Sequence, residues 1–194
     1  MGDLLSKEIN EIQWSDLEDL IKDNSSEDER LEFKSALSSK GRDDPWYSGA
    51  SDIGDKARNE LLEEVIAFAN ACGGCLVLGM EETPDKPPRA AKIRPVPRCV
   101  ELADRLALQA RDCIEPKLPV IHIRGIPTGP DGAGVVVVRV ETSRLRPHRL
   151  LANKECYVRR HDRSEKMTMR EIRDLTLLSH FEGQERDQVR MTCF

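Results

Sequence analysis

The feature that most constrains the fold is a helical pattern of apolar residues that runs, through a pair of glycines, into a short apolar strand. From Ala57 to Cys72 the apolar side chains share one helix face, at positions 61, 62, 65, 66 and 69. Gly73 and Gly74 end this helix. Residues 75–80, which read Cys-Leu-Val-Leu-Gly-Met, are typical of a buried strand. The sequence therefore predicts a helix that turns tightly into a strand of the core.

Further strands are predicted from alternation and from apolar runs. In residues 30–34 polar and apolar residues alternate, which directs Leu31 and Phe33 toward the core and Glu32 to the opposite face. A turn-rich segment at 127–133 joins two apolar runs and predicts a hairpin. The remaining expected strands lie at 91–94, 120–126, 134–141 and 156–160.

Capping signals predict where three further helices begin. A helix of about two turns starts at Ser15, which with Glu18 forms a capping box. Pro97 suits the first position of a helix that runs to about residue 114. A second capping box at Thr168 opens a last helix that ends near residue 180. The order of these elements predicts an α+β domain, with a mixed β-sheet and flanking helices.

The chain divides into one main domain and two shorter appendages. We expect an N-terminal helical extension at 1–26, the domain at 27–182, and a polar, frayed tail at 183–194. Residues 35–57 are rich in Ser, Gly, Asp and Pro and are predicted to form a long surface loop, with Trp46 and Tyr47 at its middle.

Cysteine usage and the N-terminus favour a cytoplasmic protein, or a nuclear one in a eukaryotic cell. The first residues are acidic and contain no apolar stretch long enough for a signal peptide or membrane span, so we expect reduced thiols and no membrane partner. Cys72 and Cys75 form a CxxC pair without a second pair at zinc-site spacing, which favours burial over metal binding or redox work. Walker, GxSxG and HExxH motifs are absent from the sequence.

Charge is distributed unevenly along the chain. The net charge is −5, yet residues 1–32 hold eleven Asp/Glu against three Lys/Arg, a net of −8. Residues 142–170 hold nine Lys/Arg against three Asp/Glu, a net of +6. A local basic stretch can attract a phosphate backbone whatever the total charge is. The alternative is that both runs are solvated faces that pair with each other.

Acidic residues flank two of the predicted strands. Glu27, Asp28, Glu29 and Glu32 surround the first, and a Glu-Glu pair at 81–82 follows the strand at 75–80. Carboxylates that meet at one end of a sheet repel unless a cation neutralises them, and a divalent metal with oxygen ligands is a common solution. Solvated surface positions are the other interpretation of the same pattern.

Two segments resemble the Schlafen-type, AlbA-like family of nucleic-acid-handling domains. They are the Glu27-x-x-x-Leu31-Glu-Phe-Lys34 segment and the stretch at 67–80, with its Ala-Phe-Ala-Asn-x-x-Gly-Gly core. Residues 147–148 and 157–159 and the capped last helix extend the resemblance over about 27–180. The resemblance implies a single AlbA-like lobe that pairs as a homodimer.

The resemblance also implies functional residues. In Schlafen-type nucleases three carboxylates support metal-dependent cleavage of transfer or ribosomal RNA. The corresponding residues here are Glu27, Glu32 and Glu82, which would hold Mg²⁺ or Mn²⁺, while Lys34 would neutralise the cluster or contact a phosphate. The family commonly has Asp at the third position, so this chain departs from the pattern there, and Glu81 is an alternative to Glu82.

The basic stretch supplies the candidate nucleic-acid contacts. Arginine suits phosphate because its planar guanidinium can donate two hydrogen bonds at once. The predicted contacts are Arg144, Arg146, His148, Arg149, Lys154, Arg159, Arg160 and Arg163.

Three functions are compatible with these patterns. The first is a metal-dependent endoribonuclease that acts on structured RNA such as tRNA. The second is a module that binds DNA or RNA without catalysis, as part of a regulator or a larger assembly. The third is a protein-interaction domain in which opposite charge patches drive association.

Overall fold

The computed structural model describes residues 4–39, 42–129 and 131–191, and is built around a mixed sheet with the strand order β1-β4-β9-β8. β1 (Leu31–Lys34) runs parallel to β4 (Gly74–Leu78). β9 (Gly134–Val140) is antiparallel to β4 and to β8 (Ile121–Pro127). The predicted α+β class with a mixed sheet and the predicted hairpin are confirmed.

Short two-stranded ladders surround this sheet. They pair β2 (Ser38–Ser39) with β3 (Arg42–Asp43), β5 (Met80–Glu82) with β6 (Ala90–Ile93), β7 (Ile114–Glu115) with β10 (Arg149–Leu150), and β11 (Tyr157–Arg160) with β12 (Arg163–Lys166). The sequence predicts β11 but not its partner β12, because β12 consists of polar residues without an apolar alternation.

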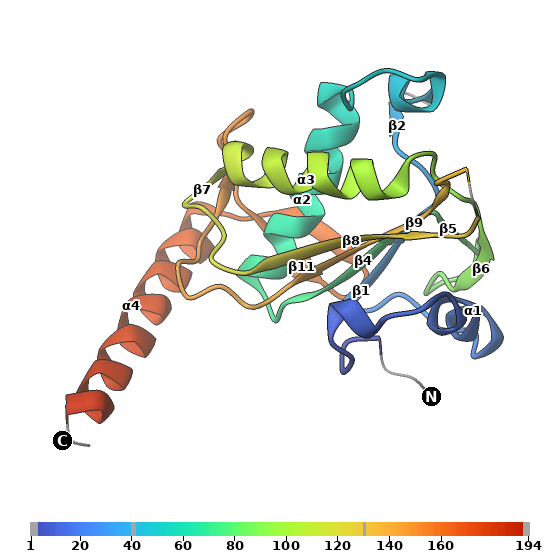
Figure 1. Ribbon diagram of the computed structural model, residues 1–194. Helices are drawn as coiled ribbons and strands as arrows, with labels where there is room; N and C mark the ends of the chain where they lie inside the picture. The colour runs from blue at the N-terminus through green and yellow to red at the C-terminus, as the bar shows by residue number, and fades with distance from the viewer. Residues whose placement is uncertain (1–3, 40–41, 130, 192–194) are drawn as a thin grey trace.

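Helices cover both faces of the sheet (Figure 1). α2 and α3 lie on one side and η1 and α1 on the other, while α4 runs away from this body. The helices are η1 (Ile9–Glu11), α1 (Trp14–Lys22), η2 (Pro45–Ser48), α2 (Asp55–Asn70), α3 (Cys99–Cys113) and α4 (Met169–Met191). Among the described residues, no helix is long and apolar enough to cross a bilayer.

The larger core lies between the sheet and the two helices α2 and α3. The α2 positions predicted from periodicity (61, 62, 65, 66 and 69) are all buried there. They pack with apolar side chains of β4 and β9, such as Leu76 and Val138. Removing this much apolar surface from water is the main force that holds α2 against the sheet.

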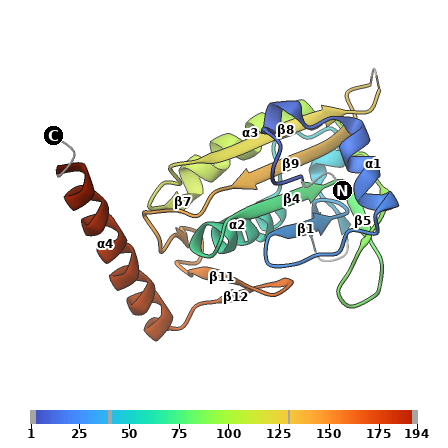
Figure 2. The same ribbon diagram turned by 90° about the horizontal axis from the view of Figure 1, so that it is seen from below.

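A second core fills the opposite face of the sheet. Leu4, Ile9, Ile12, Leu17 and Leu20 of the N-terminal segment are buried against side chains of β1, β4 and β9. The N-terminal extension therefore shares a core with the sheet that follows it. Figure 2, which views the molecule from below, shows this segment lying across the strands.

The prediction of a surface loop at 35–57 is wrong at its centre. Trp46 is 0% exposed and donates its Nε1–H to the carbonyl of Pro97 at 2.8 Å. The guanidinium of Arg98 lies over the Trp46 ring, 3.7 Å from its centroid. The Asp44 carboxylate accepts from the backbone N–H groups of Trp46 and Gly54, at 3.0 and 2.9 Å. A buried aromatic with a satisfied N–H thus anchors a segment whose composition alone indicates a loop.

Three helix boundaries also differ from the predictions. Gln13, rather than Ser15, caps α1, and the Asp16 carboxylate accepts from the Gln13 N–H at 2.8 Å. α3 begins at Cys99, because Arg98 adopts a left-handed conformation with φ of 51°. α4 does start after Thr168, whose capping box with Glu171 forms as predicted, but it extends to Met191 instead of fraying near residue 180.

The tight exit from α2 has a clear steric cause. Gly73 has a φ of +70°, and a Cβ there would lie 2.7 Å from the carbonyl oxygen of Val140. A Cβ on Gly74 would overlap the ring of Phe68. Glycine at both positions lets the end of α2 lie directly against the sheet.

Asn70 at the end of α2 joins two distant segments. Its Nδ2 donates to the carbonyls of His148 and Tyr157, at 3.0 and 2.8 Å, and its Oδ1 accepts from the His148 N–H at 2.7 Å. These backbone groups lie in the interior, where an unpaired group would be costly. Asn70 therefore has an architectural role, since it holds the segments around His148 and Tyr157 at the end of α2.

Candidate functional site

Two of the predicted carboxylates come together at β1. Glu27 and Glu32 are only 5% and 4% exposed. Glu27 lies before the strand, and its Oε1 accepts from the backbone N–H of Phe33 at 2.7 Å. Glu32 lies on the strand face opposite Phe33, as the alternation predicts.

Glu32 belongs to a buried charge network, which we define as Glu32, Lys34, Glu64 and Arg159. Arg159 of β11 donates from Nη2 to Glu32 at 2.6 Å and from Nη1 to Glu64 of α2 at 3.0 Å. Lys34 Nζ contacts the other oxygen of Glu32 and lies 3.5 Å from Glu64 Oε1. The network therefore links β1, α2 and β11 by alternating charges.

Further contacts fix Arg159 in place. Its side chain is 1% exposed and also donates to the backbone carbonyls of Asp28 and Leu31. Its guanidinium lies 5.1 Å from the ring centroid of Phe68. Ser164 on β12 donates its hydroxyl hydrogen to Glu64. Arg159 thus has its donors satisfied inside the protein, and so serves the network rather than a solvent-exposed ligand.

Burial and the neighbouring charges of the network shift the pKa values of Lys34 and Glu32. Burial would lower the pKa of Lys34, but the charges of Glu32 and Glu64 outweigh burial and raise that pKa, which keeps the ammonium charged. Burial raises the pKa of Glu32, while the positive charges of Lys34 and Arg159 oppose this by stabilising the carboxylate.

The pKa of Glu27 is raised far enough to change its protonation at neutral pH. Burial raises the pKa of Glu27 to about 8, helped by the negative charges of Glu32 and Glu82, whereas the hydrogen bond from the Phe33 N–H opposes the rise. No cation forms an ion pair with Glu27 among the described residues. At neutral pH this carboxyl group therefore keeps its proton.

The third predicted carboxylate, Glu82, lies at the edge of this site. It ends β5 and is exposed, while Glu81 before it is half-buried and opposite Lys92 of β6. The hairpin of β5 and β6 is tied to the Glu27 segment, because the Glu27 N–H donates to the carbonyl of Pro88 at 2.8 Å. Glu82 thus acts on Glu27 through its charge, without a direct hydrogen bond in the described part of the chain.

The carboxylates as they lie do not fit a preformed metal site. In the described ranges, no three or more His, Cys, Asp or Glu side chains are grouped so that they could hold an ion. Both oxygens of Glu32 already contact cations, and Glu27 holds a proton at neutral pH. A divalent ion would have to displace Lys34 or Arg159 from Glu32 and the proton from Glu27. Whether Mg²⁺ or Mn²⁺ binds stays a prediction.

The CxxC cysteines do not face one another as a metal or redox pair would. Cys75 is fully buried in β4, whereas Cys72 is exposed at the end of α2. Cys72, Cys99, Cys113 and Cys156 are free thiols. Cys193 lies outside the described residues.

Two of the predicted nucleic-acid contacts are interior. His148 is 0% exposed, and its Nδ1 lies 2.6 Å from the carbonyl oxygen of Pro116, so this nitrogen carries the proton and donates. Burial lowers the pKa of His148. Neither His148 nor Arg159 can reach a phosphate from these positions, because each side chain is enclosed and already bonded inside the protein.

Three more of these arginines are paired with carboxylates. Arg146 bonds Glu182 of α4 at 2.8 Å, and Arg149 bonds Glu115 at 2.6 Å. Arg160 contacts Glu171. The partners Glu115, Glu171 and Glu182 lie outside the acidic segment at 1–32, so these pairs do not match the alternative in which the two charged runs pair with each other. Of the predicted contacts, Arg159 does pair with that segment, through Glu32.

The remaining three cations are exposed. Arg144 and Lys154 make no side-chain ion pair or hydrogen bond with any residue that the structure describes. Arg163, the first residue of β12, is 68% exposed. Its Nε lies 3.8 Å from Oδ1 of the neighbouring Asp162, which is a long ion pair. These three side chains are the members of the predicted set that are available to a phosphate.

Sequence reasoning missed Glu64 as a site residue. Glu63 and Glu64 interrupt the apolar positions of the helix pattern between Leu62 and Val65. An acidic residue next to the buried stripe of a helix is a usable signal, because such a residue is either at the edge of the stripe or paired inside. The identity of its partners could not be read from this pattern.

Comparison with known proteins agrees with this architecture. The model of the family described as Schlafen, AlbA_2 matches residues 27–168. The chain belongs to this family, and is therefore a nucleic-acid-related domain. No curated protein matches the chain.

Two solved structures match parts of this chain at low identity and with TM-scores below 0.5. The DIP2311 protein from Corynebacterium diphtheriae has 15% identity and a TM-score of 0.45, covering 79% of this chain and 26% of its own. The N-terminal domain of a RecG-related protein from Nitrosomonas europaea has 20% identity and a TM-score of 0.43, covering 68% of this chain and 74% of its own. The present chain thus spans about a quarter of the first of these proteins.

Proposed function

We propose that this chain is a nucleic-acid-binding module whose buried charge network is structural. The observation that carries the proposal is the pairing of Glu32, the central residue of the expected catalytic set, with both Lys34 and Arg159. A carboxylate held by two cations has little remaining capacity to bind a metal. The exposed cations Arg144, Lys154 and Arg163 then supply phosphate contacts.

Salt-dependent binding tests this function. Affinity for labelled tRNA and for duplex DNA is measured by fluorescence anisotropy from 50 to 200 mM salt, for the natural chain and for the triple variant R144Q/K154Q/R163Q. Removing one bound phosphate should flatten the slope of log K against log salt by about 0.7 to 0.9. We expect weaker binding and a flatter slope in the variant.

A charge-matched control separates specific contacts from net charge. The variant K22Q/K56Q/R111Q also loses three positive charges, from exposed side chains on α1, α2 and α3. It should bind almost as the natural chain does. Equal loss of affinity in the two triple variants, or binding that does not depend on salt, contradicts the proposal. The same titrations with RNA and DNA decide which nucleic acid is preferred.

An endoribonuclease is the second candidate, and one observation favours it. Glu27 and Glu32 are both buried at β1, and the negative charges of Glu32 and Glu82 both act on Glu27. Lys34 lies beside Glu32, where it could also contact a substrate phosphate. A raised carboxyl pKa of this kind is a feature of functional sites, though ion-pair networks cause it too.

A cleavage assay tests the nuclease candidate. Purified protein is incubated with tRNA and Mn²⁺ or Mg²⁺, beside E27Q and the exposed control E29Q. E27Q is preferable to a change at Glu32, because Glu27 is outside the ion pairs and Gln can still accept from the Phe33 N–H. The candidate predicts cleavage by the natural chain and by E29Q, and none by E27Q. Equal products from all three, or no cleavage at all, refute it.

The homodimer and the interaction-domain hypothesis also remain open proposals. Leu177, Leu178 and Phe181 are 51–60% exposed on α4, which supports a contact between chains along this helix. Light scattering across protein and salt concentrations tests both ideas. A monomer under all conditions excludes self-association.

A further inference from the structure

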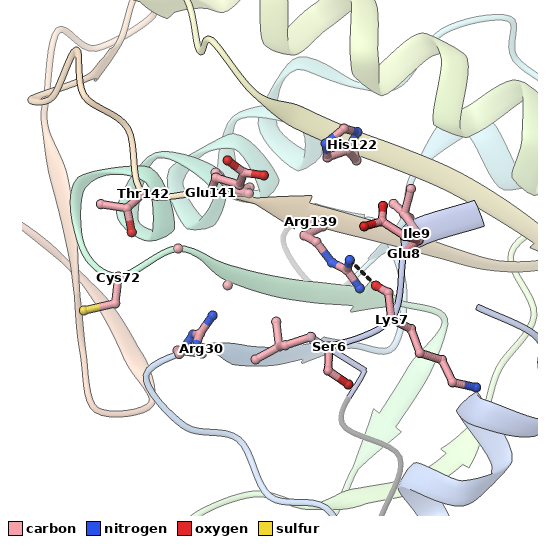
Figure 3. Close-up of a pocket in the computed structure, with 14 residues that line it drawn as sticks. Ser6, Lys7, Glu8, Ile9, Arg30, Cys72, His122, Arg139, Glu141 and Thr142 are labelled. Carbon is pink, nitrogen blue, oxygen red and sulfur yellow. Dashed lines mark hydrogen bonds between the residues drawn. The ribbon is translucent and has the colours of Figure 1, made fainter. Parts of the chain in front are cut away.

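A polar pocket of about 340 Å³ lies between the N-terminal segment and one end of the sheet (Figure 3). Its walls come from residues 5–9, the start of β4, the start of β8 and the end of β9. The volume falls within the range of small-molecule sites, about 300–1,000 Å³. Neither the buried charge network nor the exposed cations Arg144, Lys154 and Arg163 line it.

Two arginines bring positive charge to the pocket, and neither forms an ion pair with a described residue. Arg30, just before β1, is exposed, and its guanidinium makes no ion pair or hydrogen bond with the described residues. Arg139 of β9 donates to the backbone carbonyls of Lys7 and Leu4, and has no carboxylate partner among those residues. These carbonyl oxygens accept from its Nη1 and Nη2 but carry no net charge to balance the cation, and its buried Nε has no hydrogen-bond partner among the described residues.

Lys7 is a third cationic residue of the pocket lining, but its charge is already neutralised. Lys7 lines it with its backbone, but the Lys7 ammonium is paired with Asp16 of α1. Figure 3 shows this amine directed away from Arg30. The guanidinium of Arg30 is therefore open to an anion, and Arg139 keeps one hydrogen on each Nη beyond its two bonds to carbonyls. Guanidinium groups with spare donors suit a doubly charged phosphate.

The rest of the lining is polar and includes acceptors. Glu8 and Glu141 are exposed carboxylates without ion-pair partners in the described part of the chain. His122 and Thr142 add an imidazole and a hydroxyl group. A bare phosphate would use only the arginines and this hydroxyl. Carboxylates beside them suit a ligand that also carries hydroxyl or amino donors.

We propose that this pocket binds a phosphate monoester of mononucleotide size, with the phosphate on Arg30 and Arg139 and the sugar or base donors toward Glu8 and Glu141. The site is separate from the proposed nucleic-acid contacts. It opens on the side of the sheet covered by residues 4–9, whereas Glu32 faces α2 on the other side. The inference therefore does not depend on the proposed function.

Calorimetric titration of the whole chain tests the site. The probes are adenosine monophosphate, inorganic phosphate and adenosine. We expect the monophosphate to bind more tightly than either of the others. R30Q should weaken its binding about tenfold or more, because it removes a charged donor that nothing else in the pocket replaces. E141Q should bind inorganic phosphate more tightly, because it removes a repelling charge.

The control is R170Q, which removes an arginine that is 85% exposed on α4 and does not line the pocket. Its affinities should equal those of the natural chain. Equal binding of adenosine and its monophosphate, a monophosphate no tighter than inorganic phosphate, or unchanged affinity in R30Q overturns the proposal. Thermal unfolding of each variant, measured in parallel, shows that it is folded.

Two further measurements complete the test. The first distinguishes a free nucleotide from the end of a nucleic-acid strand as the source of the phosphate, and the second distinguishes failure of the pocket proposal from failure of the proposed function. A trinucleotide with a 5′-phosphate that binds more tightly than the free monophosphate assigns the pocket to a strand end, and the reverse assigns it to a free nucleotide. The variant R144Q/K154Q/R163Q should retain monophosphate binding in full. Failure of nucleic-acid binding with retained monophosphate binding would refute the proposed function alone, and a loss of monophosphate binding in this variant would refute the pocket.

Discussion

The pH dependence of stability should reveal the proton on Glu27. Folding raises the pKa of Glu27 from 4.5 to about 8, so the folded state holds this proton more tightly than the unfolded chain does. The resulting stabilisation is complete below pH 4.5 and is lost as the pH rises through 8. At 1.36 kcal/mol per pKa unit, the 3.5-unit difference between 4.5 and about 8 corresponds to roughly 5 kcal/mol. About 3 kcal/mol of this is already lost at pH 7.

The variant E27Q removes the titrating group while keeping its shape. Gln can accept the hydrogen bond from the Phe33 N–H, which Glu27 accepts at 2.7 Å. We therefore expect the free energy of unfolding of E27Q to fall much less between pH 5 and pH 9 than that of the natural chain. The difference between the two proteins should shift in favour of E27Q by up to roughly 4 kcal/mol over this range.

Urea unfolding at pH 5, 7 and 9, followed by circular dichroism, measures these free energies. E29Q is the matched control, since Glu29 is exposed two residues away, and its stability should parallel that of the natural chain. Comparing variants cancels the contributions of other titrating groups. If E27Q and the natural chain show parallel curves from pH 5 to 9, the buried protonated carboxyl group is refuted.

The remaining predictions concern the residues that hold the segments together. N70A leaves two buried carbonyls and one N–H without a partner, and should lower the unfolding free energy by at least about 2 kcal/mol in urea titrations. R159M leaves Glu32 buried without one of its two cations and should cost about 3–5 kcal/mol, of which the double variant R159M/E32M should recover a large part. Because burial lowers the pKa of His148, stability should fall as the pH drops below 6.5, and H148N should weaken that fall in acid titrations. For each of the three, a change smaller than about 0.5 kcal/mol would show that the contact contributes little.

The elements that were predicted correctly are those with strong local patterns. The helix at α2, the strand β4 and the hairpin of β8 and β9 each have an apolar period or a cluster of turn residues that indicates their type. β12 and the middle of the 35–57 segment lack such a pattern. Their structure depends on partners elsewhere in the chain, such as Pro97 for Trp46.

The candidate site was predictable in part for the same reason. Glu27, Glu32 and Lys34 are near one another in sequence, and strand alternation places the last two on the same face. Glu64 and Arg159 contact Glu32 or its partners from 32 and 127 residues further along the chain. No local rule relates residues at such separations.

The sequence by itself determined the strands of the main sheet and the helices that pack on it, and placed acidic residues at β1 and basic residues in the last third of the chain. Only the tertiary structure decided which charges neutralise one another. An arginine expected on the surface, Arg159, lies inside and holds Glu32 and Glu64, because a buried carboxylate is stable only beside a cation that completes its hydrogen bonds. Arg30 and Arg139 form no ion pair with a described acidic side chain, although Glu8 and Glu141 line the same pocket, because an ion pair requires the two groups to be in contact and only the fold sets that distance.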